Sequence, residues 1–248
     1  MSEYVWDPDD FAALWTSDGR DTFPAPLSYL SRFAYNDEVE MHRKQVRARY
    51  TDLELDDIEQ AMRAVGDCLA RIEILGGTTV HGVLREYRIV GGRTPTTAAV
   101  FIQTTTESGA DGRIRVRPCR PADLGTQLAT AVPRRDAGRL PQATFQPHDL
   151  AARPGNGLTR SPREQYQALV ARPTDGGGVA AIFSGPLHAR VDPADTVQWY
   201  DVVDDGRYLE RRTRSQVLVR PGSGPELGAA FTKWLESAAR RAAEQSWA

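Results

Sequence analysis

Cysteine and lysine are both scarce in this chain of 248 residues. The two cysteines, Cys68 and Cys119, lie far apart and outside any CxxC spacing, so neither a disulfide framework nor a zinc site is indicated. Lysine occurs only as Lys44 and Lys233, and the remaining positive charge is arginine, which we attribute to codon bias. The net charge of −2 gives no global basic field that would attract nucleic acid or anionic lipid.

The chain also lacks long apolar runs and catalytic spacings. No apolar stretch approaches the length that crosses a membrane, and the acidic opening residues have no apolar core of a signal peptide. We therefore predict a cytoplasmic protein that does not insert into a membrane. The four histidines never fall in HxxxH or HExxH spacing, and no lysine follows the glycine run 176–178 as in a phosphate loop. We predict no catalytic residue, no metal and no cofactor.

A local basic strand is the only feature that would suit a nucleic acid. Arg113, Arg115 and Arg117 alternate along it, and Arg120 follows. Alternate arginines on one face of a strand can grip phosphate, but they also form a solvated face or protect a sheet edge. Because the whole chain is nearly neutral, we favour the solvated face and predict no nucleic-acid partner.

One segment of the sequence occurs twice. Residues 116–128 read VRPCRPADLGTQL and residues 219–231 read VRPGSGPELGAAF, with five identical positions and no gap. Each copy has the pattern of a strand that ends at a proline, followed by a helix with an acidic residue in its first turn. We interpret the pair as an internal duplication. A generic strand–turn–helix junction that arose twice stays open as the alternative.

Strand and helix signals are arranged similarly around both copies. The capping box Ser161-x-x-Glu164 and the turn pair Asp205-Gly206 are the strongest local signals for a helix start and a hairpin. We read the glycine pairs 76–77 and 91–92 and the run 176–178 as turns. The predicted strands are 25–33, 69–75, 82–90, 97–105, 112–117, 142–146, 179–184, 195–203, 207–212 and 215–219. One predicted helix begins at Asp7-Pro8, and five others cover about 36–50, 54–65, 121–131, 161–172 and 224–244.

These signals predict an α+β fold. Each half contains helix, antiparallel meander and helix, instead of the alternating strands and helices of a parallel sheet. We expect one domain whose halves, about 1–133 and 161–248, are joined by a segment rich in proline and glycine at 134–160. The two meanders would form one central antiparallel sheet with helices on its face and ends.

Several motifs resemble those of the EspG family of actinobacterial type VII (ESX) secretion-associated proteins. The hairpin WYDVVDDGRYL at 199–209 is followed by a strand and an amphipathic helix from Val217 to about Ala243. The first half contains a Pro26-Leu27 pair and a predicted helix near whose end Leu128 is followed, five residues later, by Pro133. The resemblance implies a central antiparallel sheet flanked by two helical bundles with quasi-twofold symmetry. It also implies a non-enzymatic cytosolic chaperone that binds the PPE tip of a PE–PPE heterodimer and keeps it soluble for secretion.

The resemblance further suggests where a partner binds. In the family the partner surface uses the central sheet, an early loop between strands and the C-terminal bundle. Mapped onto this chain, it implies a partner-binding set made of loop residues, residues of the first meander and residues of the matching strand in the second half: Thr78, Thr79, His81, Arg85, Tyr87, Gln198 and Tyr200. A homodimer of the protein without its partner is kept as an open alternative.

A second function from another class also remains open at this point. A small-ligand binder or a hydrolase would have a pocket between the halves, built on His148, Ser184 or His188. Ser184 and His188 are close in sequence, but no GxSxG motif surrounds the serine. Such a protein would be stabilised by a small molecule, whereas the chaperone would purify with a PE–PPE pair.

Overall fold

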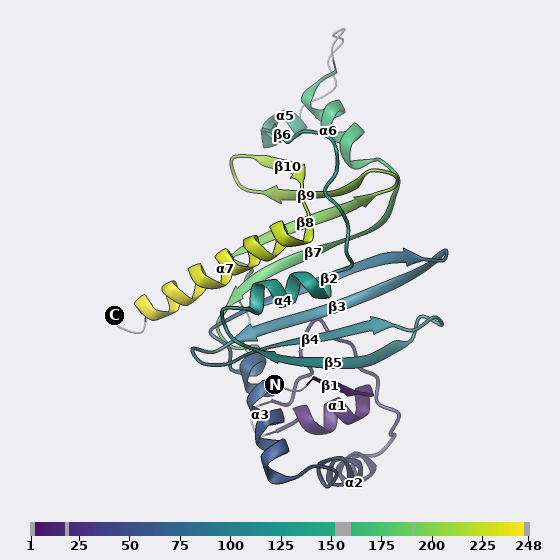
Figure 1. Ribbon diagram of the computed structural model, residues 1–248, viewed down its shortest axis with the longest axis vertical. Coiled ribbons are helices and arrows are strands. Elements are labelled where there is room, and N and C mark those ends of the chain that lie inside the picture. The colour runs from purple at the N-terminus through teal and green to yellow at the C-terminus, as the bar shows by residue number, and fades with distance from the viewer. Residues whose placement is uncertain (1–2, 18–19, 152–159, 190, 246–248) are drawn as a thin grey trace.

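The computed structural model describes residues 3–17, 20–151, 160–189 and 191–245. Within these residues, one antiparallel sheet of ten strands forms the centre of the molecule (Figure 1), in the order β1-β5-β4-β3-β2-β7-β8-β9-β10-β6. The strands are β1 (Tyr4–Trp6), β2 (Ala70–Val80), β3 (Val83–Arg93), β4 (Ala98–Thr105), β5 (Asp111–Cys119), β6 (Ala143–Phe145), β7 (Thr174–Ser184), β8 (Asp195–Val202), β9 (Gly206–Arg212) and β10 (Val217–Pro221). The predicted α+β class and central antiparallel sheet are therefore confirmed.

The two halves of the chain contribute to the sheet in the same way. Strands β2–β5 form the first meander, β7–β10 form the second, and the meanders meet where β2 pairs with β7. The last strand of each meander also pairs with a three-residue strand at the edge of the sheet, β1 on β5 and β6 on β10. Each half is thus a short strand, helices, a four-stranded meander and a final helix. That a duplication produced this arrangement stays a prediction.

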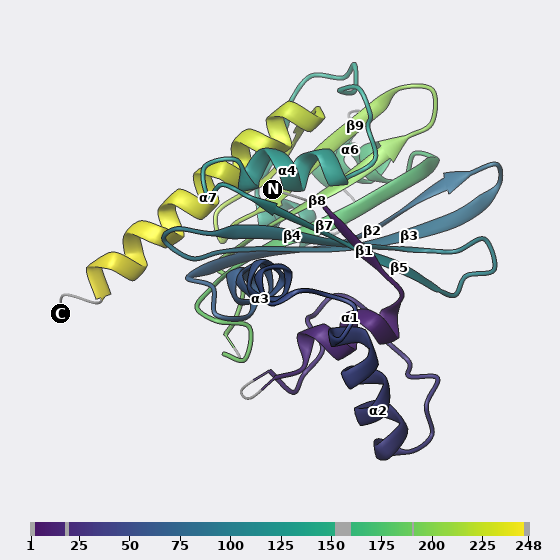
Figure 2. The same cartoon turned by 60° about the horizontal axis from the view of Figure 1, so that its bottom comes forward.

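The helices lie on both faces of the sheet. Within the described residues they are α1 (Pro8–Trp15), α2 (Asn36–Arg47), α3 (Asp52–Gly66), α4 (Leu124–Ala131), α5 (Pro147–Ala151), α6 (Pro162–Val170) and α7 (Gly224–Gln245). Helices α4 and α7 cover the middle of one face, whereas α1–α3 lie on the other side of the sheet (Figure 2). On that second face α5 and α6 pack against the outer strands of the second meander.

The helix pair α4–α7 joins the two copies of the sequence repeat. A Cβ atom added to Gly125 would lie 2.3 Å from the Oγ1 atom of Thr232, and one added to Gly228 would lie 3.4 Å from the Cβ atom of Ala129. Thr232 is four residues after Gly228, and Ala129 is four residues after Gly125. The helices therefore cross at equivalent positions, where small residues allow close approach.

Alternation along the strands separates the core into layers on the two faces. The layer under α4 and α7 contains Val100 of β4, Trp199 of β8 and Phe231 of α7. On the opposite face, Phe101 packs among the side chains of α1–α3, including Phe11. The outer strands of the second meander bury a third cluster against α5 and α6, made of Phe145, Val202, Tyr208, Val217 and Val219. Burial on both faces holds the sheet between its helices.

Two groups of sequence predictions were wrong. Residues 25–33 form no strand, and within this run the backbone of Ser28 bonds to the side chain of Gln103. The backbone N–H of Ser28 donates to Gln103 Oε1, and Gln103 Nε2 donates to the carbonyl of Ser28, both at 2.8 Å. The glycine pairs 76–77 and 91–92 and the run 176–178 lie inside strands instead of turns. A Cβ on Gly76 would meet the Tyr87 ring at 2.3 Å, so these glycines make room for neighbouring groups.

The segment 134–160 packs on the second meander over its described part. Strand β6 pairs with β10, and Ala137 forms a parallel bridge with Arg207.

The capping box predicted at the start of α6 is confirmed, since the Ser161 N–H donates to Glu164 Oε2 at 2.8 Å and Ser161 Oγ accepts from the Glu164 N–H. Residues 152–159 of the predicted linker lie outside the described residues.

Candidate partner interface

The hairpin of β2 and β3 extends beyond its neighbouring strands. Its register runs to the pair Val80↔Val83, and the two turn residues His81 and Gly82 have φ values of 50° and 79°. Positive φ at both positions is the requirement of a tight two-residue hairpin turn. Thr78 and Thr79, which the sequence analysis placed in a loop, therefore lie within β2.

The hairpin tip, which we define as residues 79–86, pairs only within the hairpin. The register with β7 reaches Thr78, and the register with β4 reaches Tyr87. Val80, Val83 and Leu84 of the tip have exposed fractions of 42%, 43% and 59%. Projecting apolar side chains of this kind are typical of a protein–protein contact site.

Further apolar side chains continue from the tip across the junction of the two meanders. Leu75 of β2 is 47% exposed, and its register partner Val179 of β7 is 40% exposed. With Val80, Val83 and Leu84 they make five of the thirteen large hydrophobic residues that are exposed among the described residues. By register, Leu75, Leu84 and Val179 lie on the face opposite α4 and α7, and Val80 and Val83 lie on the other face at the end of the hairpin. We name these five residues the apolar hairpin patch.

A hollow of about 500 Å³ lies beside this patch. Its floor contains Gly77 of β2 and Gly177 of β7, which face each other in register, so no side chain fills the space above them. Leu75, Leu84 and Arg88 are among the residues around it. An apolar projection with a hollow beside it offers a partner both a ridge and a recess.

The seven residues of the implied partner-binding set do not share one surface. Directly opposed residues of an antiparallel pair point to the same face, so register assigns each of them. Thr78, Arg85 and Tyr87 lie on the face that carries α4 and α7. Thr79, Gln198 and Tyr200 lie on the opposite face. His81 lies at the turn. A partner that contacts all of the exposed members must reach around the hairpin.

Tyr87 lies in the core, with an exposed fraction of 3%. Its hydroxyl donates a hydrogen bond to the Gly177 carbonyl at 2.9 Å, and burial raises the pKa of this hydroxyl to about 12. A buried ring offers no face to a partner in this structure. Tyr87 can therefore act on a partner surface only from beneath, by fixing β3 against β2 and β7.

The other members of the set differ in how firmly they are held. The Arg85 guanidinium donates to Glu107 at 2.7 Å and to the Thr105 carbonyl at 3.3 Å. Gln198 is exposed, whereas Tyr200 is half-buried and donates to Glu210 Oε2 at 3.0 Å. Burial first, and then the Glu210 carboxylate, raise the pKa of Tyr200. Gln198 is therefore available to a partner, while Tyr200 is bound to the sheet.

The apolar hairpin patch was not predicted from the sequence. A usable signal was present, because a His81-Gly82 turn stands between Val80 on one side and Val83-Leu84 on the other. Two apolar flanks around a glycine turn indicate a hairpin whose end carries apolar side chains. The glycine pair at 76–77 concealed this, since we read it as the turn itself.

The residues of the alternative ligand site lie on separate elements. His148 is on α5 with an exposed side chain, Ser184 ends β7, and His188 follows that strand in an exposed loop. Within the described part of the chain no hydrogen bond joins any two of them. A hollow of about 810 Å³ lies between the halves, where α4 ends and α7 begins, and none of the three lines it. A smaller hollow of about 340 Å³ is lined by residues of both halves, and of the three it includes only His188.

Two further findings concern metals and membranes. No group of three or more histidine, cysteine, aspartate or glutamate residues in the described ranges is placed to hold a metal ion. No helix in those ranges is both long enough and apolar enough to cross a membrane.

Comparisons with known proteins agree with this architecture. The model of the EspG family matches residues 7–232. No curated protein sequence matches this chain. A solved structure that is similar to it is the Mycobacterium tuberculosis type VII secretion system chaperone EspG5 in complex with a PE25–PPE41 dimer. The two chains share 9% identity with a TM-score of 0.57, and the likeness covers 96% of each chain, which is a similarity of fold.

Proposed function

This chain belongs to the EspG family, and from that membership we propose that it is a type VII secretion chaperone that binds a PE–PPE dimer. The family match over residues 7–232 is the observation that carries the proposal. Further support comes from the EspG5 chaperone, which has a similar fold and whose structure holds a PE25–PPE41 dimer.

The apolar hairpin patch supports a chaperone that works by covering a surface. A secreted dimer with an apolar tip would self-associate unless another surface removed that tip from water. Val83 and Leu84 project from the hairpin and are about half exposed, so they have apolar area left to bury. Exposed apolar residues on a well-paired hairpin need little reorganisation, which lowers the cost of binding.

We assign the contact to the hairpin and to neighbouring polar side chains that are at least partly exposed. Thr78, Thr79, His81 and Arg85 lie on or next to the tip, and Gln198 lies on β8 in register with Val179. Tyr200 and Tyr87 support this surface through their hydrogen bonds to Glu210 and Gly177. Leu75 and Val179 continue the apolar area between the tip and Gln198.

We further propose that the protein acts without catalysis and in the cytoplasm. Covering an apolar tip requires buried area and shape, and it requires no bond to be made or broken. A chaperone for an export pathway meets its cargo before export, which supports the cytoplasm as the place of action. The same patch could pair with a second copy when the partner is absent, which keeps a homodimer as the alternative for the unbound protein.

The replacement Leu84→Asp tests this assignment. Full burial of a leucine side chain contributes about 1.5–3 kcal/mol, so losing Leu84 and placing a charge there should weaken partner binding at least about tenfold. Affinity for a purified PE–PPE dimer would be measured by calorimetry. Leu53→Asp is the matched control, because Leu53 is 80% exposed and lies at the start of α3. Equal affinity of Leu84→Asp and Leu53→Asp would contradict the assignment.

The polar residues of the proposed contact need their own test. Arg85→Glu reverses a charge at the edge of the proposed contact, and we expect weaker binding with a slower association rate. Tyr87→Ala does not serve this purpose, because it would open a cavity in the core. Unchanged affinity and association rate for Arg85→Glu would remove Arg85 from the contact.

A further inference from the structure

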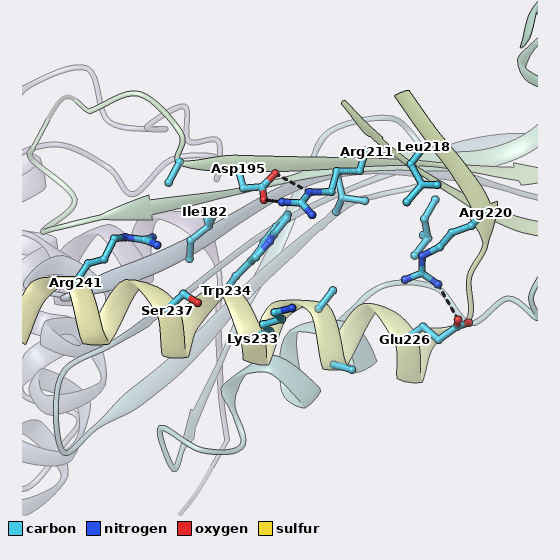
Figure 3. A pocket seen from close by; sticks show the side chains of 15 residues that line it. Ile182, Asp195, Arg211, Leu218, Arg220, Glu226, Lys233, Trp234, Ser237 and Arg241 are labelled. Carbon is cyan, nitrogen blue, oxygen red and sulfur yellow. Dashed lines mark hydrogen bonds and ion pairs between the residues drawn. The ribbon is translucent and has the colours of Figure 1, made fainter. Parts of the chain in front are cut away.

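A second groove lies on the sheet face opposite to Leu84, between α7 and the strands β7–β10 (Figure 3). Its volume is about 710 Å³. The apolar part consists of four strand residues and one helix residue: Ile182, Val197, Leu209, Leu218 and Trp234. Helix α4 does not line it, so this part of the sheet face is covered by α7 alone.

One stripe of α7 forms the whole helical wall of the groove. The lining positions 226, 229, 230, 233, 234, 237 and 241 recur every three or four residues, which is the spacing of a single helix face. From Glu226 to Arg241 this stripe is about 22 Å long at the rise of an α-helix. Small side chains at Ala229, Ala230 and Ser237 leave space along it. The groove is therefore elongated and runs along about four turns of α7.

The groove is positively charged in a chain with a net charge of −2. Four cations and two carboxylates line it. Arg211 pairs with Asp195, and Arg220 pairs with Glu226 at 2.8 Å; Figure 3 marks both pairs with dashed lines. Lys233 and Arg241 are the other two cations, and within the described residues the structure gives neither of them an ion pair. Two positive charges, eight residues apart on one helix face, are therefore left to attract an anionic partner.

We propose that this groove binds an acidic amphipathic helix of another protein, about four turns long. Its apolar stripe packs on Trp234 and Leu218, and its carboxylates meet Lys233 and Arg241. Two carboxylates spaced seven or eight residues apart on a helix fall on one face, matching the spacing of these cations. A helix seated in an apolar groove is a common mode of peptide recognition. This inference does not depend on the proposed chaperone function, because no residue that lines the groove belongs to the apolar hairpin patch or to the partner-binding set.

The scarcity of lysine makes the test direct. Lys233 lies in the groove, and Lys44, the only other lysine, is exposed on α2. A synthetic helical peptide with leucines on one face and glutamates beside them is the probe, and acetylation of each lysine by an amine-reactive reagent is followed by mass spectrometry. We expect the peptide to abolish acetylation of Lys233 and to leave that of Lys44 unchanged. Equal acetylation of Lys233 with and without peptide would overturn the proposal.

Affinity measurements on variants test the charge argument. Reversing both cations, with Lys233→Glu and Arg241→Glu, should weaken peptide binding at least about tenfold, whereas the control Lys44→Glu should not change it. A peptide with lysine in place of each glutamate should fail to bind. Equal binding of both peptides would overturn the proposal.

Two other occupants are distinguished by the same acetylation assay. Protection of Lys233 by decyl sulfate but not by the peptide would mean that the groove takes a small amphiphile. Protection that rises with protein concentration in the absence of peptide would mean that a second copy occupies it. Either result contradicts the acidic helix. The footprint uses the unaltered protein, so it remains decisive even if a reversed variant folds poorly.

Discussion

The replacement Gly125→Ala tests the contact between the two repeat helices. The added Cβ atom would lie 2.3 Å from Oγ1, 2.6 Å from the backbone N and 2.9 Å from Cα of Thr232. Two of these atoms belong to the backbone of α7, so a change of side-chain rotamer cannot relieve the contact. Either α4 and α7 must separate or one of them must shift along the other.

The magnitude follows from two opposing effects. Overpacking of a close contact costs about 1–3 kcal/mol, while alanine gains up to about 1 kcal/mol over glycine in a helix. The net loss of stability for Gly125→Ala is about 1–2 kcal/mol, which lowers Tm by about 2–8 °C in a chain of this size. Gly228→Ala is the matched variant, because its Cβ atom would meet Ala129 at 3.4 Å, an acceptable contact. It should be neutral or more stable by up to about 1 kcal/mol.

Urea unfolding followed by circular dichroism measures both changes. Gly125→Ala should be less stable than Gly228→Ala by about 1–3 kcal/mol, which is the overpacking cost, because the propensity gain is common to both variants and cancels. If the two variants are equally stable, the close approach at Gly125 is not a feature of the folded protein.

Two further changes test the second meander. The side chains of Arg207 and Asp201 form an ion pair and are both 1% exposed, so Arg207→Met leaves the Asp201 carboxylate buried without its partner. This change should lower the free energy of unfolding, measured by urea titration, by about 3–5 kcal/mol. A loss under about 1 kcal/mol would contradict this. The hydrogen bond from the Tyr208 hydroxyl lowers the pKa of Asp205 to about 2. Ionised Asp205 therefore stabilises the fold above about pH 4, and this stabilisation is lost as the pH falls towards 2. Asp205→Asn should therefore be less stable than the unaltered protein at neutral pH and should approach it in thermal melts as the pH falls through this window, whereas a constant difference would refute the assignment.

The sequence predicted those parts of the fold that local patterns determine. The capping box at Ser161 was confirmed because its hydrogen bonds involve neighbours in sequence. The hairpin predicted at Asp205-Gly206 is present, but its loop is residues 203–205 and Gly206 is the first residue of β9. The α+β class followed from the order of helix and strand signals. The repeated segment also drew attention to α4 and α7, whose glycines meet at equivalent positions.

The sequence could not reveal features that depend on which strands become neighbours. Gly76 and Gly178 resemble turn residues, but β2 and β7 are neighbours in the sheet, and the two glycines accommodate the rings of Tyr87 and Trp199. The irregular run at 25–33 is bonded at Ser28 to the side chain of Gln103, 75 residues later in the chain. The sequence position of Tyr87 is consistent with an exposed side chain on one face of β3. That face is buried only because α4 and α7 pack over it, which the sequence does not reveal.

The WYDVVDDGRYL motif, which supported the family resemblance, has a structural explanation. Asp201 and Arg207 form a buried ion pair across the β8–β9 hairpin, with Arg207 Nε donating to Asp201 Oδ1 at 2.6 Å. The same guanidinium lies 5.8 Å from the centre of the Trp199 ring and donates to the Pro133 carbonyl at 2.8 Å. The motif therefore joins the second meander to the end of the first half, and Tyr200 is its one member of the partner-binding set.

Co-expression with a PE–PPE pair from the same organism is the most direct test of the chaperone function. The complex would be purified through a tag on the PE–PPE pair and its mass measured by size-exclusion chromatography with light scattering. We predict a stoichiometric ternary complex from the unaltered protein and from Leu53→Asp, and its loss with Leu84→Asp. Elution of this protein apart from every PE–PPE pair tested, while the pairs themselves remain folded, would contradict the proposed function.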